Sequence, residues 1–215
     1  MTSTPVRVLL TGFEPFDGRD ANASQDAVRA VEEAWADPGV ELVVRVLPVS
    51  FRRARQQLRV LVAEVEPNVV VCVGEAGGRE AVGIERVAVN LIDARIPDAD
   101  GSAPVDLPVI AGAPAAFFST LPVKAAALAV ADAGVPVEVS GTAGTYVCNA
   151  TFYALMHLLD RSPHVRGGFV HVPLAPTEDG GPGMPTALAA RAVEEVVATA
   201  ARVTTDVRVS AGREA

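Results

Sequence analysis

The chain has 215 residues and a formal net charge of −8. Its length suits a single α/β domain with a full core, and no change of composition marks a boundary within residues 1–215. No cluster of Lys and Arg is dense enough to follow a phosphate backbone, so we expect no nucleic acid partner. The apolar runs are too short to span a bilayer, and residues 1–5 lack the pattern of a signal peptide. We therefore expect no membrane partner and a cytoplasmic location.

Strand and helix patterns alternate along the first third of the chain. We expect strands at residues 6–11, 41–48 and 69–74, and helices at 24–36 and 51–65 between them. Asn22 or Ser24 is the expected N-cap of the first helix, and Pro67 follows the end of the second. This order predicts an α/β/α sandwich with a mostly parallel twisted central sheet and helices on both faces. Ligands of such sheets bind at loops that follow the carboxyl ends of strands.

The remaining two thirds continue the pattern after one long interruption. Residues 84–92 show partial alternation and include several β-branched residues, which predicts another strand. Residues 93–115 hold four prolines and two glycines, so we expect a long ordered loop or arm that serves function or oligomer contacts. We then expect helices at 123–133, 148–160 and 185–203, strands at 135–140 and 168–173, and a tail at 205–215 that forms a short strand or frays.

The two cysteines differ in setting, and their small number fits a reducing compartment and no metal site. Cys72 lies inside an apolar run typical of a buried strand, so its role is structural. Cys148 follows a loop rich in Gly and Thr and opens an amphipathic helix. Unpaired N–H groups and the positive end of the helix dipole favour a thiolate there, and they can hold an oxyanion. A small buried hydrophobic residue is the alternative interpretation of Cys148.

A nucleophilic thiol needs a base, and three histidines are available. His157 lies nine residues along the same helix, about 13 Å away by helical rise, and His164 follows a proline in a surface turn. His171 lies near the carboxyl end of a buried strand and is the preferred base, although a core histidine bonded to backbone is the alternative.

The base needs an orienting acceptor in turn. Glu85 is the leading candidate because it interrupts an apolar strand just after a glycine-rich loop. Asp93 and Asp98 stay open, since composition does not choose among the three carboxylates.

Five motifs in order resemble the type I pyroglutamyl peptidases, also called pyrrolidone carboxyl peptidases, which are cysteine peptidases. The motifs are LLTGFEPFDG at 9–18, VGEAGGR at 73–79, ERVAVNLIDARIPDADG at 85–101, GTAGTYVCNATFY at 141–153 and GGFVHVP at 167–173. The resemblance implies that Cys148 is the nucleophile, His171 the general base and acid, and Glu85 the orienting residue. It also implies release of an N-terminal pyroglutamyl residue from peptides without metal or organic cofactor, in a homo-oligomer that is often a tetramer.

The same resemblance implies a pocket for the flat, neutral lactam ring of pyroglutamate. Phe13 and Phe16 would flank the ring, although packing of these aromatic rings on the core is the alternative. Ile96, Tyr146 and Val147 would line the same pocket. Arg95 and the backbone N–H of Cys148 would stabilise the oxyanion, unless Arg95 instead pairs with a nearby aspartate, Asp93 or Asp98.

Glu75 departs from the family pattern, which usually has Gln at this position. An ionised carboxylate only accepts hydrogen bonds, whereas an amide also donates. Glu75 can still accept from the lactam N–H, but a second carboxylate near the site can raise the pKa of the thiol or compete with Glu85 for His171. A non-catalytic lactam-binding module is therefore the alternative function. A nucleoside- or phosphate-binding domain is disfavoured because the glycine patterns of such sites are missing.

Overall fold

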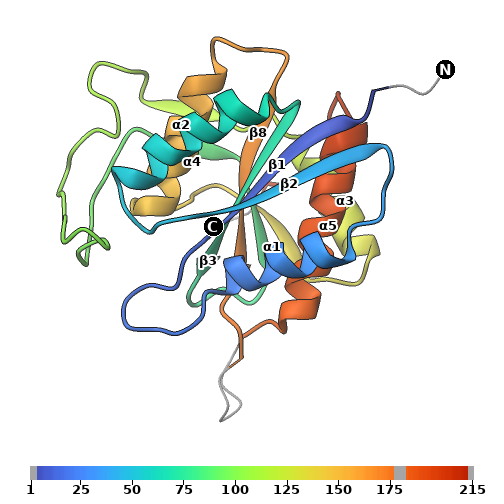
Figure 1. Cartoon of the computed structure of the whole chain (residues 1–215), viewed down its shortest axis with the longest axis horizontal. Helices are drawn as coiled ribbons and strands as arrows, with labels where there is room; N and C mark the ends of the chain where they lie inside the picture. The colour runs from blue at the N-terminus through green and yellow to red at the C-terminus, as the bar shows by residue number, and fades with distance from the viewer. Residues whose placement is uncertain (1–3, 177–182, 213–215) are drawn as a thin grey trace.

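The computed structural model describes residues 4–176 and 183–212. Its central feature is a six-stranded sheet in the order β2-β1-β3-β8-β4-β7 (Figure 1). The strands are β1 (Val6–Phe13), β2 (Val40–Leu47), β3 (Val69–Ala76), β4 (Val82–Glu85), β7 (Val137–Ser140) and β8 (Arg166–Pro173). Only the β4–β8 pair is antiparallel. The predicted mostly parallel sheet is confirmed.

Helices cover both faces of this sheet (Figure 1). One face carries α1 (Ala23–Ala34), α3 (Val123–Asp132) and α5 (Thr186–Arg202), and the other carries α2 (Arg53–Val65) and α4 (Val147–Leu159). Strand alternation sorts the core between the two faces: Val71 and Val73 pack toward α1 and α5, whereas Cys72 packs toward α2 and α4. The predicted α/β/α sandwich is therefore confirmed.

Most predicted elements differ from the observed ones by one to three residues at their ends. Asn22 is the N-cap of α1, since its side chain accepts from Ser24 N at 3.0 Å. The prediction of one strand over 84–92 is wrong. The chain leaves the large sheet at Arg86, and the short β5 (Val87–Val89) pairs with β6 (Ala116–Phe118) in a separate two-stranded sheet.

The C-terminal tail forms no strand between residues 203 and 212, and residues 213–215 lie outside the described part of the chain. Asp206 instead accepts hydrogen bonds from the backbone N–H groups of Lys124 and Ala125. These N–H groups at the start of α3 have no partner within the helix, so Asp206 of the tail serves as a cap for that helix. Among the described residues, no helix is long and apolar enough to cross a membrane.

The arm at residues 93–115 contains no helix and no extended strand, as predicted. An isolated antiparallel bridge between Ile92 and Leu107 closes its base. Asn90 holds the C-terminal part of the arm, because its side chain donates hydrogen bonds to the carbonyls of Ile110 and Ala113. These bonds explain how a proline-rich segment of this length stays ordered without secondary structure of its own.

Candidate active site

Cys148 is the second residue of α4, and this helix begins directly after the loop formed by residues 141–146. Its backbone N–H has no partner within the helix at this position. The loop is tied down on one side by Thr145, whose side chain and carbonyl bond the backbone of Asp93. Cys148 is partly exposed, whereas Cys72 is fully buried in β3. The two thiols therefore have the contrasting settings that the sequence predicts.

Gly74 gives the Cys148 sulfur its place against the sheet. A Cβ atom added to Gly74 would lie only 2.8 Å from Cys148 Sγ, so any larger residue would displace the thiol. Gly74 on β3 is the register partner of His171 on β8. Neighbouring strands lie about 4.8 Å apart, and paired residues point to the same face. The His171 side chain therefore points to the face of the sheet on which the Cys148 thiol lies.

Glu85 orients the imidazole. Its Oε1 lies 2.8 Å from His171 Nδ1, and the side chains are 0 % and 4 % exposed. A carboxylate accepts from the Nδ1–H group, which leaves Nε2 free to take a proton. Asp93 is exposed, and Asp98 binds backbone N–H groups elsewhere. Of the three carboxylates left open by the sequence, only Glu85 contacts His171.

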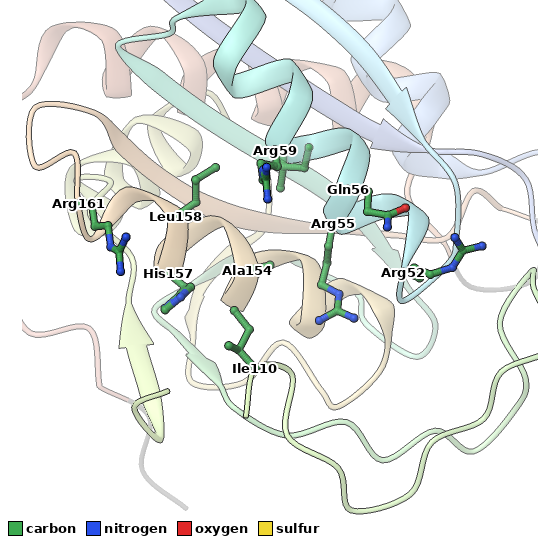
Figure 2. Close-up of a pocket in the computed structure, with 10 residues that line it drawn as sticks. Arg52, Arg55, Gln56, Arg59, Ile110, Ala154, His157, Leu158 and Arg161 are labelled. Carbon is green, nitrogen blue, oxygen red and sulfur yellow. The ribbon is translucent and has the colours of Figure 1, made fainter. Parts of the chain in front are cut away.

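The other histidines lie away from Cys148. His164 is exposed, and the His157 ring packs on Phe117 with 5.8 Å between ring centroids. His157 also lines a cavity of about 530 Å³ between α2 and α4 (Figure 2). Four arginines line this cavity as well, and none of the predicted site residues does so: Arg52, Arg55, Arg59 and Arg161.

Burial shifts the pKa values of Cys148 and His171. It raises the pKa of Cys148 to about 12, an effect that Glu85 reinforces and Arg79 opposes. Burial also lowers the pKa of His171 below 6.5, against the opposing influence of Glu85. Burial therefore opposes the thiolate that the helix N-terminus favours. Both shifts favour the uncharged forms of the two groups, a thiol and a neutral imidazole.

The thiol opens onto a cavity of about 370 Å³ at the carboxyl ends of β1 and β3. All the substrate-binding and oxyanion residues predicted from the sequence line this one cavity: Phe13, Phe16, Glu75, Arg95, Ile96, Tyr146, Val147 and Cys148. Aromatic contacts shape one wall, since the Tyr146 ring lies 6.1 Å from that of Phe16 and 5.1 Å from that of Phe51. The cavity is therefore mostly apolar with a few polar groups, as is typical of small-molecule sites.

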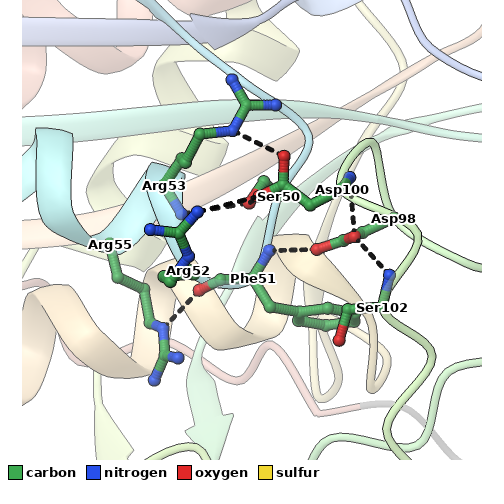
Figure 3. Close-up of polar contacts among 8 residues, drawn as sticks. All are labelled: Ser50, Phe51, Arg52, Arg53, Arg55, Asp98, Asp100 and Ser102. Carbon is green, nitrogen blue, oxygen red and sulfur yellow. Dashed lines mark hydrogen bonds and ion pairs between the residues drawn. The ribbon is translucent and has the colours of Figure 1, made fainter.

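Arg95 is exposed at the cavity and makes no ion pair or hydrogen bond with any described residue. Neither of its predicted alternative partners, Asp93 and Asp98, forms an ion pair with it. Asp98 accepts from the backbone N–H groups of Phe51, Asp100 and Ser102 at 2.8–2.9 Å (Figure 3). These bonds fasten the loop that carries Arg95 to the start of α2. The free guanidinium can therefore act on a bound substrate.

Glu75 is neutralised within the site. One carboxylate oxygen pairs with Arg19, and the other accepts from the backbone N–H of Ala23 at 2.8 Å, at the start of α1. The cation and the helix N-terminus both favour the ionised carboxylate. Glu75 contacts neither Cys148 nor His171 in these bonds, so the expected competition with Glu85 does not arise.

Sequence reasoning missed two residues that hold the site together. Asn149, fully buried in α4, exchanges hydrogen bonds with the backbone of Val89 and donates to the carbonyl of Leu91. Arg79 pairs with Glu85. A polar residue directly after Cys148, and an arginine at the end of the VGEAGGR motif, were the available signals. The partners of Asn149, and the Thr142 carbonyl that Arg79 also binds, lie far away in the sequence.

Comparison with known proteins agrees with this geometry. The family model described as pyroglutamyl peptidase matches residues 6–204. A pyrrolidone-carboxylate peptidase of Clavibacter michiganensis is 51 % identical over 95 % of this chain and 97 % of its own. One of Streptomyces coelicolor is 47 % identical over 91 % and 92 %. The crystal structure of pyroglutamyl peptidase I from Bacillus amyloliquefaciens superposes with a TM-score of 0.92 at 38 % identity, covering 96 % of this chain and all of that one. This chain belongs to the pyroglutamyl peptidase family of cysteine peptidases.

Proposed function

We propose that this protein removes N-terminal pyroglutamyl residues from peptides through a Cys148–His171–Glu85 triad and a thioester intermediate. The observation that carries the proposal is the bond between Glu85 and His171 behind a thiol that opens onto the apolar cavity. A nucleophile, a base and an orienting carboxylate in that order are the requirements of acyl transfer.

In the first step, Cys148 Sγ attacks the carbonyl carbon of the pyroglutamyl residue while His171 Nε2 takes the thiol proton. Burial raises the pKa of Cys148 and lowers that of His171, and both shifts favour a general-base step. Glu85 then stabilises the imidazolium that forms. The negative charge that develops on the carbonyl oxygen is held by Cys148 N–H and the free guanidinium of Arg95.

In the second half, the bond between the carbonyl carbon and the leaving nitrogen breaks, and His171 gives its proton to the departing amine. The product is a thioester between Cys148 and pyroglutamate. Water then attacks the thioester carbon as His171 takes a proton from it, and release of pyroglutamate restores the thiol.

Selectivity for the lactam follows from the lining of the cavity. Phe13 and Phe16 offer apolar faces to a flat ring, and Ile96, Tyr146 and Val147 close around it. A prolyl residue has the same ring size but carries a charged secondary amine, which is costly to bury in such surroundings. The pocket therefore favours the uncharged lactam.

We expect the protein to hydrolyse a fluorogenic pyroglutamyl amide with a kcat/KM at least about 10³-fold higher than the matching prolyl amide. The measurement is release of the fluorophore from each substrate under reducing conditions. Saturable binding of pyroglutamate without turnover, by a folded and reduced protein, would instead identify a lactam-binding module. Equal turnover of both amides would contradict the proposed pocket.

Glu75 and Arg19 provide a test of how the pocket tolerates a carboxylate. Replacing Arg19 with Met leaves Glu75 without its cation, so we expect KM for the pyroglutamyl amide to rise by about three- to tenfold. The double variant Arg19→Met/Glu75→Gln should return toward the wild-type KM, because the charge that Arg19 balances is gone. The matched control is Arg29→Met, which breaks an exposed pair with Glu32 on the outer side of α1. Additive effects of the two site substitutions would show that Arg19 does not act through Glu75.

Assembly and location stay predictions. Three exposed apolar side chains on or beside the arm support contacts between copies of the chain: Val105, Leu107 and Phe118. Two free cysteines support a reducing, cytoplasmic setting.

A further inference from the structure

Arg79 lies where β3 leads into β4 and touches two separate parts of the site. Its Nη1 lies 2.8 Å from Glu85 Oε1, the same oxygen that contacts His171. No N–H of that nitrogen points squarely at the oxygen, so the contact is an ion pair rather than a hydrogen bond. Its Nη2 donates a hydrogen bond of 2.9 Å to the carbonyl of Thr142, in the loop that leads to Cys148.

The burial of Glu85 makes this ion pair important. Glu85 is fully buried, and its Oε2 has no hydrogen-bond partner among the described residues. A buried carboxylate is costly unless a cation lies beside it. Apart from His171, Arg79 is the cationic group paired with Glu85 in the described part of the chain.

The backbone leaves room for the guanidinium. The guanidinium of Arg79 lies over Gly83, which is two residues before Glu85 and on the same face of β4. A Cβ atom added to Gly83 would clash with Arg79 Nη1. Gly83 is also the register partner of His171. Glycines thus flank His171 on both neighbouring strands, one making room for the Cys148 thiol and the other for Arg79.

We propose that Arg79 is a positioning residue of the reaction, holding the Glu85 carboxylate against His171 and the Cys148 loop against both. This inference rests on the proposed function. Arg79 does not line the substrate cavity, and its partners among the described residues are Glu85 and the carbonyl of Thr142 rather than the thiol. It therefore acts through Glu85 and Thr142.

The charge of Arg79 gives the proposal a signature in the pH profile. Among the described residues, the charged groups that act on His171 are Glu85 on β4 and Arg79, and the apolar ring of Phe169 lies 4.9 Å from its ring. Arg79 lowers the pKa of His171, whereas Glu85 raises it. Loss of Arg79 should therefore raise that pKa. The reaction needs neutral His171, so kcat/KM falls at acid pH as His171 becomes protonated. This acid limb of the pH profile should therefore move to higher pH.

The test compares Arg79→Met and Arg79→Lys with the wild type on the pyroglutamyl amide from pH 5 upward. For Arg79→Met we expect kcat to fall by about 10- to 100-fold with KM within about threefold of the wild type, because a misplaced base slows chemistry more than binding. Arg79→Lys should restore the acid limb, since it keeps the charge, but only part of kcat, since it cannot bridge two acceptors in fixed geometry.

Arg7→Met is the matched control. Arg7 also joins a carboxylate, Glu41, to a backbone carbonyl, that of Val65, but it lies at the amino end of β1. We expect its loss to leave kcat and the acid limb unchanged. A purely structural role for Arg79 would lower the melting temperature without moving the limb.

A second readout uses the cavity of about 720 Å³ that Arg79 lines together with Ser140 and Thr142. Guanidinium ions added at millimolar concentration should partly restore kcat of Arg79→Ala but not of Glu85→Gln. Wild-type kcat and an unmoved limb in the Arg79→Met variant would overturn the inference, as would an Arg79→Lys limb displaced like that of Arg79→Met. Absence of Cys148-dependent hydrolysis by the wild type would instead overturn the proposed function.

Discussion

Replacing Cys148 by Ala is expected to lower kcat/KM for a pyroglutamyl amide by on the order of 10⁴-fold or more, because no other group can form the acyl-enzyme. The fold should be unaffected, since Ala is accepted well near a helix start and leaves the loop bonds of Thr145 in place. The measurement is steady-state hydrolysis alongside the melting temperature of each protein.

Cys72→Ala is the matched control. It also removes a thiol, and this thiol faces α2 and α4 from β3, but it is fully buried and burial raises its pKa to about 12. We expect a lower melting temperature from the small cavity and an activity close to that of the wild type. Retained turnover by Cys148→Ala, or its loss from a folded Cys72→Ala protein, would contradict the assignment of the nucleophile.

Glu85→Gln is expected to lower kcat/KM by about 10²- to 10⁴-fold. An amide keeps the shape of the carboxylate but can present an N–H group to His171 Nδ1, which favours the tautomer whose Nε2 carries the proton. It also leaves the partly buried Arg79 beside a neutral partner. The matched control is Glu41→Gln, which alters a half-exposed pair with Arg7 far from the thiol.

The pH profile of kcat/KM distinguishes loss of the Glu85 carboxylate from loss of the Arg79 guanidinium. In the wild type, the acid limb should lie below pH 6.5, because burial lowers the pKa of His171 from that value. Glu85 raises this pKa, so its loss should move the limb of the residual activity to still lower pH. The direction is opposite to that expected for Arg79→Met. An upward shift in Glu85→Gln would contradict the view that its charge supports the imidazolium.

Features that depend on neighbouring residues could be predicted from the sequence. The apolar run around Cys72 predicts a buried strand, and the loop before Cys148 predicts a thiol at a helix start, because both depend on local spacing. Choosing His171 over His157 also needed only helical rise and strand position. The fold class follows from the same alternation of short elements.

Features that depend on partners distant in sequence could not be predicted. Glu75 meets Arg19 and the start of α1 only once β3 lies beside β1. The break between β4 and β5 depends on where β6 lies, which no local pattern records. Local reasoning also favoured a thiolate at Cys148, because the helix dipole is visible in the sequence whereas the burial that opposes the thiolate is not.

The place of β8 in the sheet has a consequence for how the protein is made. β8 lies between β3 and β4, yet it comes from residues 166–173, late in the chain. A chain emerging from the ribosome can pair β1, β2 and β3, and separately β4 and β7, but these halves share no strand until β8 arrives. Insertion of β8 completes the sheet and brings His171 to Glu85 in a single event. Nascent chains that end before residue 166 therefore carry Cys148 without His171, and the bond between Glu85 and His171 forms only near the end of synthesis.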